Sequence, residues 1–557
     1  MWAQNWERNF EVLAPRENIY RLDEVAFPKQ VNQGKRIALF YPVTVSDLLV
    51  PYEPLKTFFE SDPKDPVRKW LYDMGRVVSP FKSMDDLYQW LGVHEFPQTS
   101  QSETPNILPI LTQNEMALPM GATLITTENG QALTFGCAAC HTGDLFGVKV
   151  LGLTNRFPRA NEFFRQGQTY APYINSFLFK DLLQTTEGER LMMLKAKNAT
   201  KWVGTKMPSA LGLDTSLAQV ALSLAKREKD AYATRTSRSA IFPRPNKLSQ
   251  MVADSKPAVW WNVKYKNRWL SDGSIVSGNP VHTNFLWNEI GRGTDLKKLE
   301  MWMKNNSQQI EALTAAVFAT RPPRYEKFFG VDSLDVEKAQ RGQKHFVQSC
   351  QKCHGVYEKG WDQAAAQNFT QTQLVQNFKV TYHKKTPVIN VGTDPGRYLG
   401  MKEFAADLNR LQISQDIKTV VEAQKGYVPP PLEGIWSRWP YFAGLPATTV
   451  GTPSGSMLKA KDVKGSFAKV PPSVHKPEWL INQTAWPSLR ATACIPQGFA
   501  IAFALSRLVS FTRLMSRGDD KRVYGWRIQA VTLHAGLRIT SEIPLAAPRR
   551  FAQPPRH

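Results

Sequence analysis

The sequence predicts a mainly α-helical protein with few strands and long irregular loops. Residues 214–232 and 295–319 carry apolar side chains at the spacing of amphipathic helices. Stretches with the two-residue alternation that is typical of half-buried strands are few. Two Cys-x-x-Cys-His runs, at 137–141 and 350–354, each fit one helical turn, because residues three and four apart share a helix face. These observations together favour a helical fold that carries two sites built from cysteine and histidine.

The chain of 557 residues is too long for one hydrophobic core, and we divide it into four segments. Residues 1–110 form an N-terminal extension that is interrupted by prolines and shows no recognisable chemistry. Residues 111–330 carry the first Cys-x-x-Cys-His run and end in TRPPRYEKFFG, which we interpret as a linker because paired prolines end helices. Residues 331–442 carry the second run, which a predicted helix precedes.

The last segment, residues 443–557, differs from the rest in composition. From Tyr441 onward there are 16 Lys and Arg but only five Asp and Glu, so this fifth of the chain holds half of the net charge of +22. We interpret it as a divergent basic tail; disorder or a shifted reading frame would explain the same composition. The first residues, MWAQNWERNFEVLAP, lack the basic and apolar regions of a secretory signal peptide.

The net charge of +22 fits an acidic partner, a membrane surface or nucleic acid, and it fits equally a soluble basic surface with no such partner. Nucleic acid is not expected, because no run of Lys and Arg interleaved with aromatic residues forms a recognisable binding module. No stretch of about 18 apolar residues predicts a membrane span.

Four of the five cysteines belong to the two runs, which leaves Cys494 alone and offers no disulfide framework. Two thiols and an imidazole on one face suit a c-type haem, whose vinyl groups the thiols bond and whose iron the histidine ligates. We therefore predict two covalently attached haems. The predicted attachment and ligand residues are Cys137, Cys140 and His141 in the first run and Cys350, Cys353 and His354 in the second. Each imidazole should be neutral and donate its other ring N–H to a backbone carbonyl.

Zinc and redox chemistry are the alternatives for these runs. A structural zinc site needs four ligands, so the two runs would have to meet in space. A thioredoxin-like dithiol needs no histidine and requires a βαβ setting, which the sequence does not show. Two independent matches that use four of five cysteines favour haem.

Several stretches between residues 110 and 442 resemble one family, the rubber-oxygenase-like bacterial dihaem c-type cytochromes, which are related to the dihaem cytochrome c peroxidases. The similar stretches are FGCAACHTGDLFGVKVLGLTNRFPRANEF, PAVWWNVKYKNRWLSDGS, FVQSCQKCHGVY, VGTDP and GYVPPPLEGIW. The resemblance ends near Phe442, where the family continues with a His-Asn-Gly-Ser turn and this chain reads AGLPATTVGTPSGS. The family's C-terminal Gly-His segment, whose histidine is the far ligand of the second haem, has no counterpart here.

The resemblance implies two cytochrome-c-like haem domains, with the first haem open to dioxygen or peroxide and the second six-coordinate. We predict a dihaem electron carrier that docks an acidic redox partner. The alternative is a haem oxidoreductase that activates dioxygen or peroxide at one open haem, with cleavage of an apolar polymer as the family's extreme example. Covalent haem attachment also implies the bacterial periplasm or secretion, although no signal peptide is visible.

Other residues have possible roles near the haems, and for each an ordinary structural role stays open. Candidate far ligands are His282, His383, His475, His534 and the 14 methionines. Candidate bridges between the haems are Trp260, Trp261 and Trp269. Candidate partners of the haem propionates are Lys264, Lys266 and Arg268. His345 is expected on the surface, and Phe346 is expected to cover the edge of the second haem.

Overall fold

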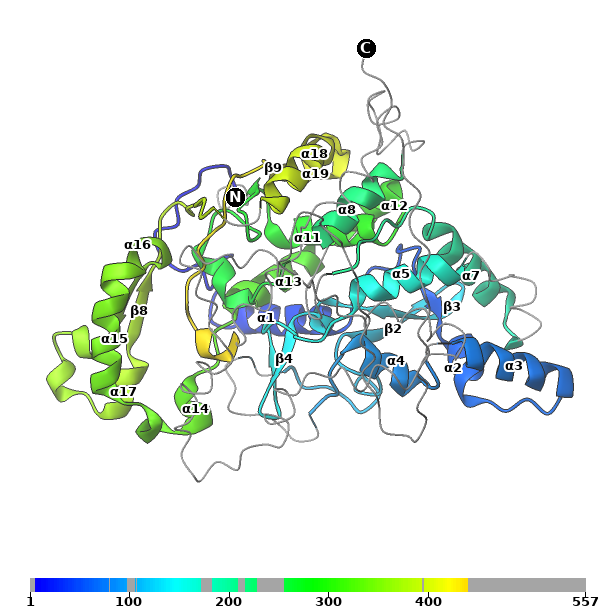
Figure 1. Ribbon diagram of the computed structural model, residues 1–557, viewed down its shortest axis with the longest axis horizontal. Coiled ribbons are helices and arrows are strands. Elements are labelled where there is room, and N and C mark those ends of the chain that lie inside the picture. Colours follow the sequence, from blue (N-terminus) through cyan, green and yellow to red (C-terminus); the bar gives the residue numbers. More distant parts are fainter. Residues whose placement is uncertain are drawn as a thin grey trace, which may run out of the picture. The chain divides into compact units, whose positions relative to one another are not determined.

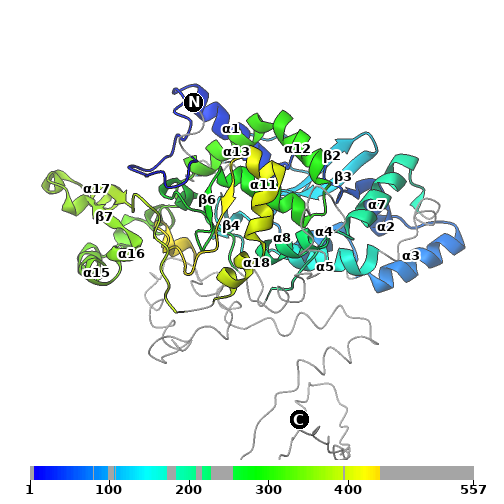
Figure 2. The same ribbon diagram turned by 90° about the horizontal axis from the view of Figure 1, so that it is seen from above.

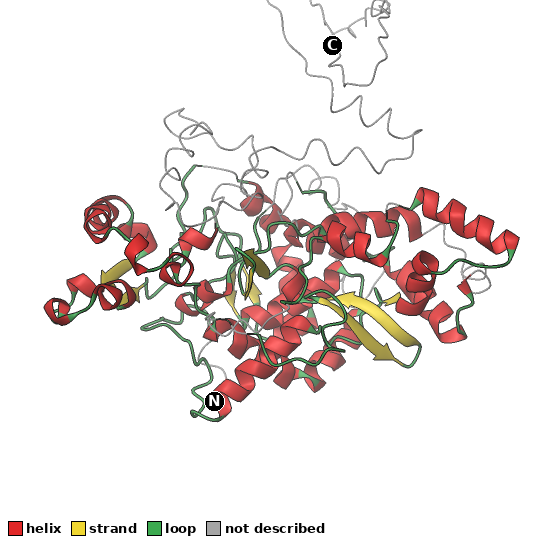
Figure 3. Ribbon diagram, turned by 90° about the horizontal axis from the view of Figure 1, so that it is seen from below, coloured by secondary structure: helices red, strands yellow, loops and turns green. Residues whose placement is uncertain are grey.

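The computed structural model describes residues 6–79, 81–97, 106, 108–171, 183–208, 216–227, 255–392 and 395–438 (Figure 1). All of them lie in one compact unit, Met1–Val474. Helices dominate this part and the strands are short (Figure 3), so the predicted mainly α fold is confirmed. The basic tail and Cys494 lie outside the described residues.

The α-helices differ widely in length. They are α1 (Ala26–Leu39), α2 (Tyr52–Glu60), α3 (Pro66–Val78), α4 (Met84–Leu91), α5 (Ala160–Tyr170), α7 (Glu187–Ala199), α8 (Ser216–Ala225), α11 (Pro280–Gly291), α12 (Leu296–Asn305), α13 (Ser307–Ala319), α14 (Tyr325–Phe329), α15 (Val336–Ser349), α16 (Gln351–His354), α17 (Gln371–Gln376), α18 (Gly396–Arg410) and α19 (Gln412–Asp416). Short 3₁₀ helices add η1 (Cys137–Ala139), η3 (Trp260–Tyr265), η4 (Val331–Ser333), η5 (Gly360–Asp362), η6 (Ala366–Asn368) and η7 (Ile435–Arg438).

The strands form small antiparallel sheets. They are β1 (Val50–Pro51), β2 (Ala122–Thr127), β3 (Gly130–Phe135), β4 (Thr142–Leu145), β5 (Val148–Leu151), β6 (Ile275–Ser277), β7 (Val356–Lys359), β8 (Phe378–Thr381) and β9 (Val420–Val421). The sheet orders are β1-β3-β2, β4-β5, β6-β9 and β7-β8. Ala122 pairs with Phe135 in the β2–β3 hairpin and Thr142 with Leu151 in the β4–β5 hairpin, so the two hairpins bracket the first Cys-x-x-Cys-His run.

The main core forms where α1 packs along α13, and the two helices lie side by side in both ribbon views (Figures 1 and 2). Gly34 permits this close crossing, because a Cβ there would lie 1.9 Å from the carbonyl oxygen of Ala312. The same core includes Ile37 of α1, Leu313 of α13 and Phe404 of α18. It therefore joins residues from all three of the segments that the sequence analysis separated at 110 and 330.

The stretches that the sequence predicts to be helical do contain helices where the structure describes them. Residues 295–319 form α12 and α13, with Asp295 capping the first by accepting from the backbone N–H of Lys298 at 2.9 Å. The stretch before the second run forms α15, which Asp335 caps in the same way. The linker prediction was only half right: after Pro322 and Pro323 the chain turns into the short helix α14.

Candidate functional site

The first Cys-x-x-Cys-His run is a tight turn between two hairpins. The backbone N–H of His141 donates to the carbonyl of Cys137 at 2.9 Å, so the run closes one helical turn that begins in η1. Gly121, at φ +87°, lies so close beneath it that a Cβ would be 2.2 Å from the backbone nitrogen of Ala139. The turn is thus held against the start of β2 by a contact that only glycine allows.

The imidazole of His141 is oriented by a distant backbone group. Its Nδ1 lies 2.9 Å from the carbonyl oxygen of Ala258. Because a carbonyl only accepts, Nδ1 carries the proton and Nε2 keeps its lone pair. Burial lowers the pKa of His141 to about 4, so the ring is neutral near pH 7, which is the form that ligates iron. Burial likewise raises the pKa of Cys137 to about 11, which keeps its thiol protonated.

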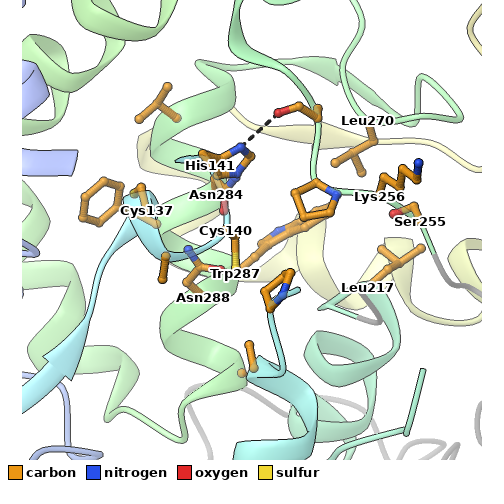
Figure 4. A pocket seen from close by; sticks show the side chains of 18 of the residues that line it. Cys137, Cys140, His141, Leu217, Ser255, Lys256, Leu270, Asn284, Trp287 and Asn288 are labelled. Atoms are coloured by element: carbon orange, nitrogen blue, oxygen red, sulfur yellow. Dashed lines mark hydrogen bonds between the residues drawn. The ribbon is translucent and has the colours of Figure 1, made fainter. Parts of the chain in front are cut away.

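Cys137, Cys140 and His141 open into a cavity of about 570 Å³. Figure 4 shows them around this space together with Asn284, Trp287 and Asn288 of α11. The volume falls within the roughly 300–1,000 Å³ range of small-molecule and cofactor sites. Most of the wall is apolar, with leucine, valine, phenylalanine and tryptophan side chains from several elements.

The polar groups of the wall fit a flat cofactor that carries carboxylates. The buried polar atoms on it with no hydrogen-bond partner among the described residues include Asn262 Oδ1, Trp269 Nε1 and Trp287 Nε1. The cationic side chains on the wall are Lys256, Lys266, Arg292, Arg397 and Arg438. Burial, and secondarily Arg438, lower the pKa of Lys266 to about 8. A carboxylate beside Lys266 would oppose both the effect of burial and the repulsion from Arg438. The thiols, the imidazole, the apolar wall and the cations of this cavity therefore together suit haem.

The second run is helical. Helix α15 leads into α16, and the backbone N–H of His354 donates to the carbonyl of Cys350 at 3.0 Å. Nδ1 of His354 lies 2.8 Å from the carbonyl oxygen of Pro430, so Nδ1 is the donor and Nε2 is the ring nitrogen left for a ligand. The predicted hydrogen bond from each motif histidine to a backbone carbonyl is therefore confirmed at both runs.

Apolar side chains gather in the neighbourhood of the second run without being buried. Phe346 stacks edge-on against Tyr357 with ring centroids 5.3 Å apart. Val347, Val356 and Phe378 are 49%, 43% and 39% exposed, and no residue of α15 or α16 is buried. A large apolar cofactor attached at Cys350 and Cys353 would cover part of such a surface. His345 is exposed, as predicted.

The candidate far ligands fall in different places. His282 is not among the residues that line the cavity, and its buried Nε2 has no hydrogen-bond partner in the described part of the chain. Nε2 of His383 lies 3.1 Å from the carbonyl oxygen of Cys353, so it is engaged by the backbone of the second run. His475 and His534 lie outside the described residues.

The three tryptophan candidates also lie in different places. Trp260 and Trp269 line the cavity, and the ring of Trp260 lies 5.6 Å from that of His141. Trp261 is fully buried and donates from Nε1 to the carbonyl of Glu433 at 3.1 Å.

Of the three cations proposed for the propionates, only Lys266 lines the cavity. Lys264 pairs with Glu17 at 2.8 Å, and Arg268 donates to Gln424 at 3.2 Å. Two of the three are thus used in contacts within the protein.

The geometry that zinc requires is not formed in the described part of the chain. No three His, Cys, Asp or Glu side chains come close enough there to hold a metal ion. None of the four motif cysteines is in a disulfide. None of the described helices is both long and apolar enough to cross a membrane.

Sequence analysis missed the contribution of the N-terminal segment to the site. Tyr41, Leu48 and Val93 line the cavity, although residues 1–110 showed no recognisable chemistry. Tyr41 donates to the buried carboxylate of Glu289 at 2.7 Å and lies under the guanidinium of Arg292, 4.5 Å from its ring centroid. No local pattern marks these residues, because all three lie outside helices and strands and reach the site only through tertiary packing.

Comparison with known proteins adds no further match. No protein-family model matches this chain, and no curated protein is significantly similar to it. The likeness to the dihaem cytochromes therefore rests on the motif stretches of the sequence.

Proposed function

We propose that this chain is a c-type cytochrome that carries electrons through two haems, attached at Cys137 and Cys140 and at Cys350 and Cys353. The observation that carries the proposal is the common orientation of His141 and His354. Each donates from Nδ1 to a backbone carbonyl, so each leaves Nε2 as the ring nitrogen available to iron, beside two cysteines that form no disulfide.

Haem bound at these positions would supply one-electron redox chemistry. The protein's own part is to orient the two imidazoles and to surround the first site with apolar side chains. Attachment needs no oxidant, because each thiol adds its S–H across a vinyl C=C bond. The first site stands on η1 and its two hairpins and the second on α15, α16 and the antiparallel pair β7 and β8, which supports two haem sites on different elements of the one compact unit.

Location and partner follow from the same proposal. Covalent haem attachment supports the bacterial periplasm or secretion. The net charge of +22 supports an acidic redox partner, whose association should weaken as salt screens the attraction.

A haem oxidoreductase that activates dioxygen or peroxide at the first site is the second candidate, and the cavity wall favours it. The described residues that line the cavity include no histidine other than His141 and no methionine. An open sixth position in apolar surroundings admits a small uncharged oxidant.

Haem counting tests the proposal. The chain is exported in a bacterium that has cytochrome c maturation machinery, and covalent haem is measured by mass spectrometry after denaturation. We expect two haems in the wild type and in Cys494→Ala, and one in Cys137→Ala/Cys140→Ala or Cys350→Ala/Cys353→Ala. A wild-type chain without covalent haem contradicts the proposal.

Carbon monoxide difference spectra then separate the two functions, because binding to one haem supports the oxidoreductase and binding to neither supports the electron carrier.

A further inference from the structure

We propose that helix α3 (Pro66–Val78) is an interfacial anchor that lies flat on an anionic lipid bilayer, with its exposed apolar side chains between the headgroups and the acyl chains. This inference goes beyond the proposed function and does not depend on haem.

The sequence gives α3 an apolar face. Residues three and four apart share a helix face, and five such positions of α3 carry large apolar side chains: Val67, Trp70, Leu71, Met74 and Val77. Their exposed fractions are 67%, 60%, 37%, 49% and 58% in this order. We call these five residues the α3 stripe. A helix of a globular protein normally turns such a stripe toward the core, whereas here it is open to a partner.

The opposite face of α3 holds the helix on α2. Tyr72 is 2% exposed, and its ring centroid lies 5.8 Å from that of Phe58. Gly75 faces the same ring, because a Cβ there would lie 2.9 Å from it. Arg76 donates from Nε to the carbonyl of Phe58 at 2.8 Å. The α3 stripe is therefore directed away from α2, and α3 lies at one end of the compact unit in Figures 1 and 2.

Helix α4 (Met84–Leu91) has a similar apolar pattern with the opposite outcome. Its apolar residues also repeat three and four apart, and they are buried in a core cluster that includes Leu133 of β3: Met84, Leu87, Tyr88 and Leu91. Both helices carry the pattern that predicts burial. In the described part of the chain, the α3 stripe lacks the covering that α4 has.

The charges and the tryptophan favour an anionic lipid surface as the partner. Helix α3 carries Arg68, Lys69 and Arg76 against Asp73, so its own net charge is +2, and that of the whole chain is +22. Cations near anionic headgroups add attraction to the burial of apolar side chains. Trp70 belongs to the residue type that is enriched at membrane interfaces, because its ring is amphipathic.

A second copy of this chain fits the α3 stripe less well. The helix has 13 residues, so its face is about 20 Å long and about 10 Å wide. That is roughly a quarter of the 800 Å² that each partner of a stable dimer buries. A lipid interface needs no second surface of matching shape, so it can cover a stripe of this size.

The test uses the full-length protein and unilamellar vesicles of phosphatidylcholine, either alone or with an equal part of phosphatidylglycerol. Sedimentation of the vesicles measures the bound fraction. We expect the wild type to bind the mixed vesicles, and the partition coefficient of Trp70→Gln/Met74→Gln to be about ten-fold lower or less. Added salt, or phosphatidylcholine alone, should weaken the binding of the wild type.

Leu13→Gln/Ile110→Gln is the matched control, because these side chains are 75% and 97% exposed and lie outside α3. It should bind as the wild type does. Circular dichroism checks that both double variants are folded, as expected for substitutions at exposed positions.

A wild type that does not bind the mixed vesicles overturns the proposal, and so does a Trp70→Gln/Met74→Gln variant that binds as tightly as the wild type. Equal binding to both kinds of vesicle overturns the choice of an anionic surface. A dimer in analytical ultracentrifugation that the same variant dissociates assigns the α3 stripe to a second copy and also overturns the proposal. None of these outcomes changes the haem count, so the proposed function is tested separately.

Discussion

Asn155 donates from its side-chain amide to the carbonyl of Ala139 at 2.8 Å and so holds the first Cys-x-x-Cys-His run from outside. The same amide donates to the carbonyl of Gly92 at 2.7 Å, and the backbone N–H of Asn155 donates to the carbonyl of Cys140 at 2.9 Å. Asn155 is 0% exposed, so these groups have no water to replace it. One side chain thus ties the haem-attachment turn to the end of α4.

Asn155→Ala should destabilise the protein and loosen the first run. It leaves two partly buried carbonyls without their donor, which costs up to about 1–3 kcal/mol each. We expect the free energy of unfolding in guanidinium to fall by that order and the yield of haem at Cys137 and Cys140 to drop. Haem at Cys350 and Cys353 should be unaffected. Asn198→Ala, at an exposed helix position, is the control and should change neither quantity.

A pair of helical glycines tests the packing of the core. Gly34→Ala should cost about 1–3 kcal/mol, because the new Cβ would clash with the backbone of Ala312 where α1 crosses α13. Gly342→Ala, in α15, meets nothing within 4 Å and should stabilise by about 0.5–1 kcal/mol through helix propensity. Thermal unfolding of both variants checks the prediction. A Gly34→Ala protein as stable as the wild type would mean that α1 does not pack on α13 as described.

His282 should make the protein less stable in mild acid. Burial lowers its pKa to about 4 from 6.5, so between these values the unfolded chain binds a proton that the folded chain does not. Stability is therefore lost as the pH falls from 6.5 through 4, by an amount on the order of 2 kcal/mol. His282→Leu should remove this loss, measured as the difference in unfolding free energy from the wild type across that range.

His345→Leu, at an exposed position of α15, is the control for replacing a histidine with leucine. The same variants test whether His282 is a far ligand. If His282→Leu instead changes the spin state of one haem in the EPR spectrum, the residue ligates iron and the acid prediction is wrong.

The motif histidines were predictable from the sequence because their role depends on local spacing. The groups that orient them were not. Ala258 is 117 residues from His141 and Pro430 is 76 residues from His354, and every residue has a carbonyl, so no pattern singles these out. Helix α15 was predictable because its cap and its spacing are local as well.

The small sheets and the cavity wall escaped the sequence analysis for related reasons. Strands β4 and β5 have only four residues each, too few for a clear alternation. Tyr41 reaches the first site only because α1 is packed on α13, a contact between segments that the sequence treats separately. Lys264 and Lys266 look alike in the sequence, yet one pairs with Glu17 and the other lines the cavity.

Lys266 provides a test of where the haem carboxylates lie. Burial and Arg438 lower its pKa to about 8 from 10.5 in the haem-free protein. Below pH 8 the folded protein carries the buried charge of Lys266, which lowers the free energy of unfolding. This loss disappears as the pH rises from 8 to 10.5, because the folded state has already released the proton while the unfolded state still holds it. Haem-free Lys266→Met should be more stable than the haem-free wild type at pH 7, and the difference should shrink toward pH 10. In the loaded protein a propionate beside Lys266 offsets that cost, so the same substitution should become neutral or destabilising.

Guanidinium unfolding of the haem-free and the loaded protein at pH 7 and pH 10 measures this effect of Lys266→Met. Lys338→Met, at an exposed position of α15, is the control that should show no difference. An equal gain in stability for the haem-free and the loaded variant would place the propionates elsewhere on the wall.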